Sequence, residues 1–109
     1  MTTITIYGAS DDLVEVAGCP NADEFNSDDW HGDLCSPGSG TMRVYARYEP
    51  DGVWSVGVSQ VDEDHQLPGW PVTITQQPAM NPDNHGYSAL LTIEAPDGTY
   101  LTGLDEDDE

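Results

Sequence analysis

The chain has 109 residues, and its 21 Asp and Glu stand against two Arg and no Lys, which gives a formal net charge of -19 at pH 7. A charge of this size repels nucleic acid, anionic membranes and phosphate-rich ligands, and it attracts basic protein surfaces and cations. Hydrophobic residues make up 37% of the chain, and three Trp and five Tyr supply the large buriable side chains that disordered acidic segments lack. We therefore expect a single domain over residues 1–104, followed by a disordered acidic tail over residues 105–109.

Alternating apolar and polar residues dominate the chain, whereas no stretch carries an apolar stripe at the helical period. We expect strands at 2–7, 13–16, 41–48, 53–61, 70–74, 87–95 and 99–104. Turn signals separate them, including Pro50-Asp51-Gly52 and Pro96-Asp97-Gly98, and the second is expected to close a hairpin between the last two strands. About seven short strands predict an all-β fold, either an antiparallel sandwich or a small barrel.

The alternation also predicts which side chains form the core. The residues expected there are Ile4, Ile6, Met42, Val44, Ala46, Tyr48, Trp54 and Trp70. Arg43 and Arg47 lie four residues apart, on the opposite face of their strand. We expect them to pair with acids of a neighbouring strand, Glu15 or Glu94.

The stretch 17–40 breaks the pattern and reads as one long acidic loop, a feature that is often functional in a compact domain. A short helix over 22–26, capped by Asn21, is one local interpretation. Trp30 has two interpretations, an exposed interface anchor ringed by carboxylates or a plug for one end of the sandwich. In an up-and-down meander this loop would share one end of the molecule with the acids at 62–64. The candidate partner-binding residues are therefore Asp23, Glu24, Asp28, Asp29, Trp30, Asp33, Asp62, Glu63 and Asp64.

Metal and enzyme interpretations have less support. Cys19, His31, Cys35 and His65 include the right ligand types for tetrahedral zinc, but the chain has no Cys-x-x-Cys, so the expectation is free thiols with zinc as an alternative. Neither a calcium-binding loop, nor a nucleophile elbow, nor a phosphate-binding loop with Lys is present. We expect no catalytic activity and no cofactor. Without a basic leader or a long apolar run, a cytoplasmic location is expected.

Several stretches resemble small acidic proteins of actinobacterial phages, a group that mostly lacks assigned functions. They are DDLVEVAG, RVYARYEPDGVWSVGVSQVDED, LPGWPVTITQ and YSALLTIEAPDGTYL, and together they span most of the chain. The likeness is one of general texture, and no site residue can be transferred from it. It implies a phage context, in which small non-enzymatic proteins block host machinery or decorate the particle, and it places the protein in the host cytoplasm.

Charge and resemblance together predict a non-catalytic interaction protein that binds a basic surface of a host protein, with mimicry of DNA and inhibition of a DNA-binding protein as one form. No direct contact with nucleic acid or membrane is expected. Three alternatives stay open. They are a structural or decoration component of a virion, a small metal-stabilised domain, and an acidity that serves only solvation or adaptation to salt.

Overall fold

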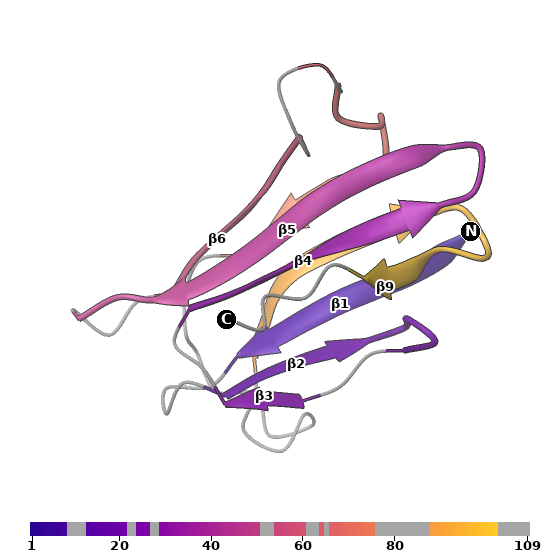
Figure 1. Ribbon diagram of the computed structural model, residues 1–109. Helices are drawn as coiled ribbons and strands as arrows, with labels where there is room; N and C mark the ends of the chain where they lie inside the picture. The colour runs from indigo at the N-terminus through magenta and orange to yellow at the C-terminus, as the bar shows by residue number, and fades with distance from the viewer. Residues whose placement is uncertain are drawn as a thin grey trace.

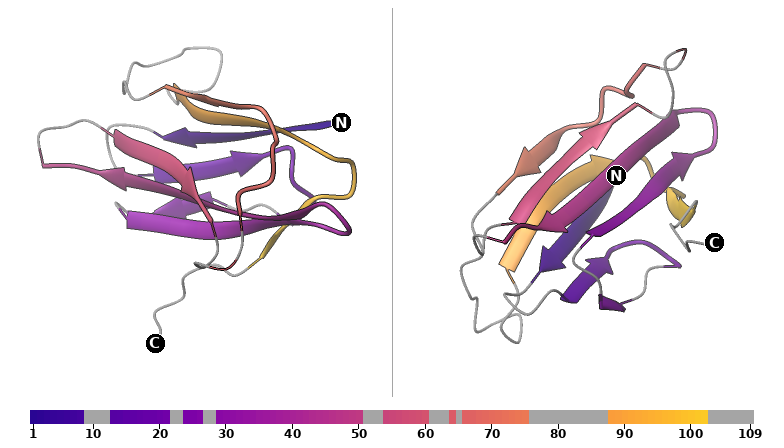
Figure 2. Two further views of the ribbon diagram at one scale, coloured as in Figure 1. Left: turned by 90° about the horizontal axis from the view of Figure 1, so that it is seen from above. Right: turned by 60° about the vertical axis from the view of Figure 1, so that its left-hand side comes forward.

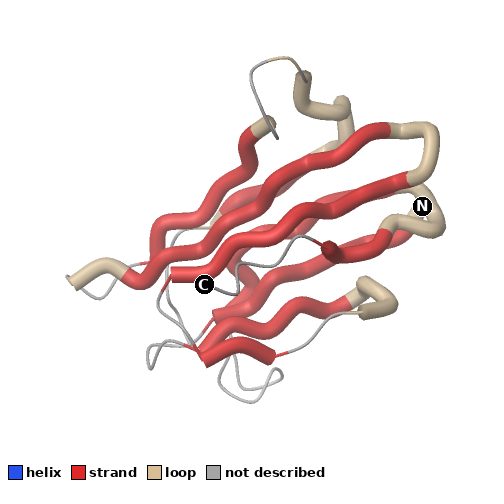
Figure 3. The backbone as a smooth tube through the Cα atoms, viewed as in Figure 1, coloured by secondary structure: helices blue, strands red, loops and turns tan. Residues whose placement is uncertain are grey.

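The structure is a computed structural model that describes residues 1–8, 13–21, 24–26, 29–50, 54–60, 64, 66–75 and 88–102. Nine strands and no helix occur in these residues (Figure 3), so the prediction of an all-β fold is confirmed, with two strands more than expected. No helix capable of crossing a membrane occurs in this part of the chain. The strands are β1 (Thr2–Gly8), β2 (Leu13–Ala17), β3 (Glu24–Asn26), β4 (Asp29–Ser36), β5 (Gly40–Tyr48), β6 (Trp54–Ser59), β7 (Val72–Ile74), β8 (Ser88–Ala95) and β9 (Tyr100–Thr102).

The strands form two antiparallel sheets that pack face to face as a sandwich (Figures 1 and 2). Sheet A has the order β3-β2-β1-β8-β7, and sheet B has the order β6-β5-β4-β9. Because β1 pairs with β8 and β4 pairs with β9, strands from opposite ends of the chain are neighbours in both sheets. The topology is therefore not the simple meander that would have placed residues 17–40 and 62–64 at one end.

The core lies between the two sheets and is filled by alternate residues of each strand. Ile4 and Ile6 of β1 face Met42, Val44 and Ala46 of β5 across it, and all five are buried, as the alternation predicted. The further buried side chains include Val14, Val16, Leu34, Trp54, Val56, Leu90, Leu91, Ile93 and Leu101, and Tyr48 and Trp70 pack against them while partly exposed. The predicted core is thus confirmed.

The expected hairpin between the last two strands is wrong. β8 belongs to sheet A and β9 to sheet B, so the intervening turn carries the chain from one sheet to the other. The hydroxyl and the amide of buried Thr99 both donate to the Pro96 carbonyl, at 2.6 and 3.2 Å, and Gly98 takes a positive φ of 91°. A Pro-Asp-Gly turn can join two strands of one sheet as a hairpin or connect strands of two different sheets. Here β9 pairs with β4 of sheet B, so the turn connects the two sheets.

The predicted acidic loop 17–40 is also wrong, because much of this stretch is strand. β4 runs antiparallel to β5 over eight residues, and the turn from Ser36 to Gly40 joins them. The helix expected over 22–26 is contradicted at Glu24–Asn26, which form β3. The predicted turn at 50–52 lies mostly outside the described residues, and the predicted tail over 105–109 lies wholly outside them.

Asn21 holds the two sheets together beside β9. It follows β2 of sheet A, yet its side-chain amide donates to the Leu101 carbonyl and its Oδ1 accepts from the Leu101 amide at 2.8 Å. A single side chain thus satisfies both backbone groups that Leu101 presents on the edge of β9 away from β4. The amide acts as a one-residue substitute for a neighbouring strand.

Candidate partner-binding surface

The outer face of sheet B carries both fixed cations of the chain. Arg43 on β5 stands directly opposite Asp33 on β4, with Nε to Oδ1 at 2.8 Å and Nη2 to Oδ2 at 3.3 Å. This hydrogen bond raises the already high pKa of Arg43, so the guanidinium is charged at every pH the protein meets. Arg47 stands opposite Asp29 in the same ladder. The predicted partners Glu15 and Glu94 are wrong, since both lie on sheet A.

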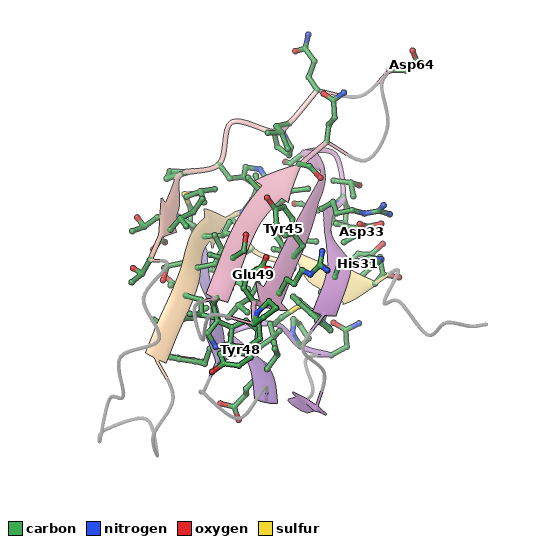
Figure 4. All side chains as sticks on the ribbon, turned by 90° about the vertical axis from the view of Figure 1, so that its left-hand side faces the viewer. His31, Asp33, Tyr45, Tyr48, Glu49 and Asp64 are labelled. Carbon is green, nitrogen blue, oxygen red and sulfur yellow. The ribbon has the colours of Figure 1, made fainter. Side chains whose placement is uncertain are left out.

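Tyrosines flank these arginines. Tyr45 lies between Arg43 and Arg47 on the outer face of β5 and is 39% exposed, while Tyr100 of β9 is 42% exposed. Tyr45 covers its cross-strand neighbour Gly57, where an added Cβ would lie 2.5 Å from the tyrosine hydroxyl. On its other side Tyr45 stands opposite His31 of β4, and Figure 4 labels both residues together with Asp33.

The outer face of sheet A has a different charge arrangement. Glu15 on β2 stands opposite Tyr7 on β1 and opposite Glu24 on β3. Glu94 on β8 stands opposite Thr3, whose hydroxyl donates to the carboxylate at 3.0 and 2.9 Å. Because both arginines of the chain lie on sheet B, no acid of sheet A faces a fixed cation across a strand pair.

Of the nine predicted partner-binding residues, the structure describes five, Glu24, Asp29, Trp30, Asp33 and Asp64, and it spreads these five over different parts of the sandwich. Asp23, Asp28, Asp62, Glu63 lie outside the described residues, and Glu24 and Asp29 fall on strands of different sheets. Asp33 is engaged by Arg43, and the exposed Asp64 lies well away from it (Figure 4). Asp29 and Asp33 are four residues apart on β4, about 13 Å along the strand.

Trp30 is not an exposed anchor. It is 3% exposed and belongs to the core, because its position on β4 faces sheet A while its neighbours on the strand face outward. The second interpretation, a buried Trp, is the correct one in that its indole fills the interior. Asp33 lies at an odd position of the same strand and faces outward, because odd and even residues of a strand face opposite sides.

The zinc alternative fails on geometry for the three candidate ligands that the structure describes. Cys19 lies in the core, where its thiol donates to Asn21 Oδ1 at 3.4 Å, whereas Cys35 lies on the outer face of β4 and accepts from the Thr41 hydroxyl at 3.6 Å. Cys35 and His31 are four residues apart on one strand, about 13 Å, while zinc ligands lie near 2 Å from the metal. The fourth candidate, His65, lies outside the described residues, and no metal-binding group of three ligands occurs among the residues that the structure describes.

Both cysteines are free thiols, as expected, and their environments differ. Burial raises the pKa of the Cys19 thiol above its usual value of 9.0, an effect that hydrogen bonds from Asn21 and Leu101 oppose. Cys35 is only partly buried. The buried thiol is therefore a core residue, while the outward-facing one borders the Arg43 and Tyr100 surface.

Sequence reasoning placed Glu15 and Glu94 beside the arginines, whereas the structure places both on the outer face of sheet A, which carries neither arginine. Their outward orientation was predictable from the alternation, which puts both on positions opposite to the buried residues of their strands. No family model, no curated protein and no solved structure matches the chain. The candidate surface is therefore argued from its residues alone.

Proposed function

We propose that the protein is a non-catalytic binding protein that presents carboxylates on a β-sandwich to a basic surface of another protein. One observation carries the proposal: both arginines lie on the outer face of sheet B, at positions opposite Asp33 and Asp29, and against 21 Asp and Glu they leave a formal net charge of -19. Such a charge accelerates association with a basic partner and repels polyanions.

The acids are distributed in a way that suits contact with a large partner. Eight of the 21 acids lie in described residues, namely Glu15, Glu24, Asp29, Asp33, Glu49, Asp64, Glu94 and Asp97. The other thirteen belong to the segments that connect the strands or follow β9. A protein that mimics DNA needs an extended negative surface, and the excess of acids over basic residues supplies the charge for one. In a phage context the partner would be a basic, DNA-binding protein of the host, met in the host cytoplasm.

The test is capture from host lysate by the immobilised full chain at 0.05 and 0.5 M NaCl. We expect a basic protein to be retained at low salt, released at high salt and displaced by added duplex DNA. Retention that does not respond to salt, or the absence of any retained basic protein, would refute the proposal. Co-purification with phage particles or self-assembly would instead favour a structural role in a virion.

A further inference from the structure

The outer edge of β7 presents backbone groups that no described strand occupies. β7 is the last strand of sheet A, and β8 is its only neighbour among the residues that the structure describes. The Pro71 carbonyl accepts from an amide of β8 at 3.0 Å and the Thr75 amide donates to a carbonyl of β8 at 2.7 Å, so the odd positions turn toward β8. In an antiparallel ladder the alternate residues, Val72 and Ile74, therefore present their N–H and C=O groups to the opposite side.

The side chains at the same two positions bring the hydrophobic core to the surface. Val72 stands opposite Ile93 and Ile74 stands opposite Leu91, and both of these partners belong to the core. Val72 packs against the core while partly exposed, and Ile74 is 44% exposed. A further strand beside β7 would pair with the outward backbone groups and cover these two apolar side chains.

β7 also lies in the longest stretch of the chain that has no acid. From His65 to Pro82 the sequence has no Asp, Glu or Arg, although the whole chain has a net charge of -19. Natural edge strands commonly carry charged side chains that oppose pairing with another chain, and β7 has none. The edge of β9 is different, because Asn21 already satisfies the backbone groups of Leu101 there. The edge of β7 is thus suited to strand addition.

We propose that the edge of β7 binds an extended, basic segment of the partner protein as an additional strand of sheet A. The inference rests on the proposed function and names its site. The outward backbone groups of Val72 and Ile74 require an extended chain, and their exposed side chains require apolar residues at alternate positions of that chain. The net charge of -19 favours Lys or Arg on either side of the apolar residues. A second copy of the chain meets the first two requirements but not the third, because two copies repel each other.

The first test titrates peptides into the isotope-labelled full chain at low salt. The peptide KKVTVTVKK supplies an extended, basic strand, and its dissociation constant should lie between about 10 μM and 1 mM because β7 is only three residues long. Hydrogen exchange of the Val72 and Ile74 amides should slow about 10-fold or more at saturation. Exchange of the Thr73 amide, which points toward β8, should change about twofold or less. Equal slowing at all three residues would overturn the inference.

Two matched peptides separate backbone pairing from charge. In the first, the three valines of KKVTVTVKK are N-methylated, which removes the amides that would pair with β7 and keeps the charge and the side chains. In the second, SSVTVTVSS, the charge is removed and the strand is kept. Each should bind about 10-fold or more weakly than KKVTVTVKK. Equal binding of the N-methylated peptide would overturn strand addition, and equal binding of SSVTVTVSS would overturn the basic occupant.

The second test compares two variants of the full chain at one position. Ile74→Pro removes the outward N–H without changing the charge, whereas Ile74→Val keeps it. Ile74→Pro should bind KKVTVTVKK about 10-fold or more weakly, and Ile74→Val should bind it within about twofold of the unaltered chain. The melting temperature of each variant shows whether the fold is intact, and the exchange experiment on the unaltered chain decides the matter if Ile74→Pro does not fold. Full binding to a folded Ile74→Pro would overturn the inference.

The outcomes distinguish this site from the proposed function. Capture of a basic host protein with equal strength by Ile74→Pro and by the unaltered chain would overturn the site and leave the function standing. Addition of KKVTVTVKK to β7 without any captured basic protein would support the site and refute the function. Protection of the Val72 and Ile74 amides that rises with protein concentration alone would show a second copy at the edge and overturn the basic occupant.

Discussion

The amide of Asn21 is expected to determine whether β9 stays attached to sheet B. Asn21→Ala removes two hydrogen bonds to Leu101, a residue with 0% exposure. A hydrogen bond contributes about 0.5–1.5 kcal/mol net, and leaving a buried partner unsatisfied costs about 1–3 kcal/mol. We therefore expect the free energy of unfolding to fall by about 2 kcal/mol, and the melting temperature to fall by roughly 8 °C for a domain of this size.

Urea denaturation followed by tryptophan fluorescence measures this loss, since Trp30 and Trp54 are buried. Hydrogen exchange of the Leu101 amide locates it, because that amide donates to Asn21 and should lose its protection in the variant. Thr102→Ala, on the exposed side of the same strand, is the control and should change stability by less than about 0.5 kcal/mol. If Asn21→Ala matches this control and Leu101 exchange is unchanged, the side chain does not hold β9.

The remaining predictions concern a glycine and the two thiols. Gly18→Ala should destabilise the fold by roughly 2–4 kcal/mol in the same urea assay, because Gly18 has a φ of 86° and an added Cβ would collide with the Thr3 carbonyl oxygen. An unchanged stability would contradict the backbone conformation of Gly18. In the native state Cys35 should react with a thiol reagent and Cys19 only on unfolding, so equal rates would contradict the burial. Burial raises the pKa of the Cys19 thiol in the folded state, so the unfolded chain loses this proton at a lower pH than the folded protein does. The neutral thiol therefore contributes fully to the free energy of unfolding below about pH 9, and this contribution should be lost as the pH rises through the pKa of the folded state. Cys19→Ala should not show this loss.

The strand faces were predictable, whereas the pairing of distant strands was not. Ile4 and Ile6 alternate with threonines, and this local pattern fixes their burial wherever the strand lies in the sheet. β1 pairs with β2 on one side and with β8 on the other. No local sequence pattern predicts the second pairing, because β8 lies about 90 residues further along the chain. The corner at Pro96 shows the same limit, because its turn residues suit a hairpin equally well.

The sequence analysis did not predict β4 as a strand, because the residues that face the core do not form a continuous apolar pattern. Gly32 and Ser36 alternate there with Trp30 and Leu34, and two small residues among four interrupt the pattern on which a strand prediction rests. Together with the outward-facing Asp33, they gave the segment the composition of a loop. Asn21 was read as a helix cap for a related reason. Its side chain does cap a backbone edge, but the edge belongs to a strand 80 residues away.

Salt should act on folding and on binding in opposite directions. Two like charges 10 Å apart repel by about 0.4 kcal/mol in unscreened water. Nineteen net charges make roughly 170 like-charge pairs at various separations, whereas the single, partly buried Arg43–Asp33 pair contributes about 1 kcal/mol of attraction. Raising NaCl from 0.01 to 1 M shortens the screening length from about 30 to about 3 Å, so repulsion weakens far more than attraction does.

The melting temperature should therefore rise steadily over this range, while capture of a basic partner falls. Measuring both on one preparation excludes the explanation that the partner is lost because the protein unfolds in salt. A melting temperature that falls with added NaCl would mean that matched pairs such as Arg43 and Asp33 outweigh the repulsion. In that case the acids of the connecting segments would have to be compensated within the fold, and they would no longer be available to a cationic surface.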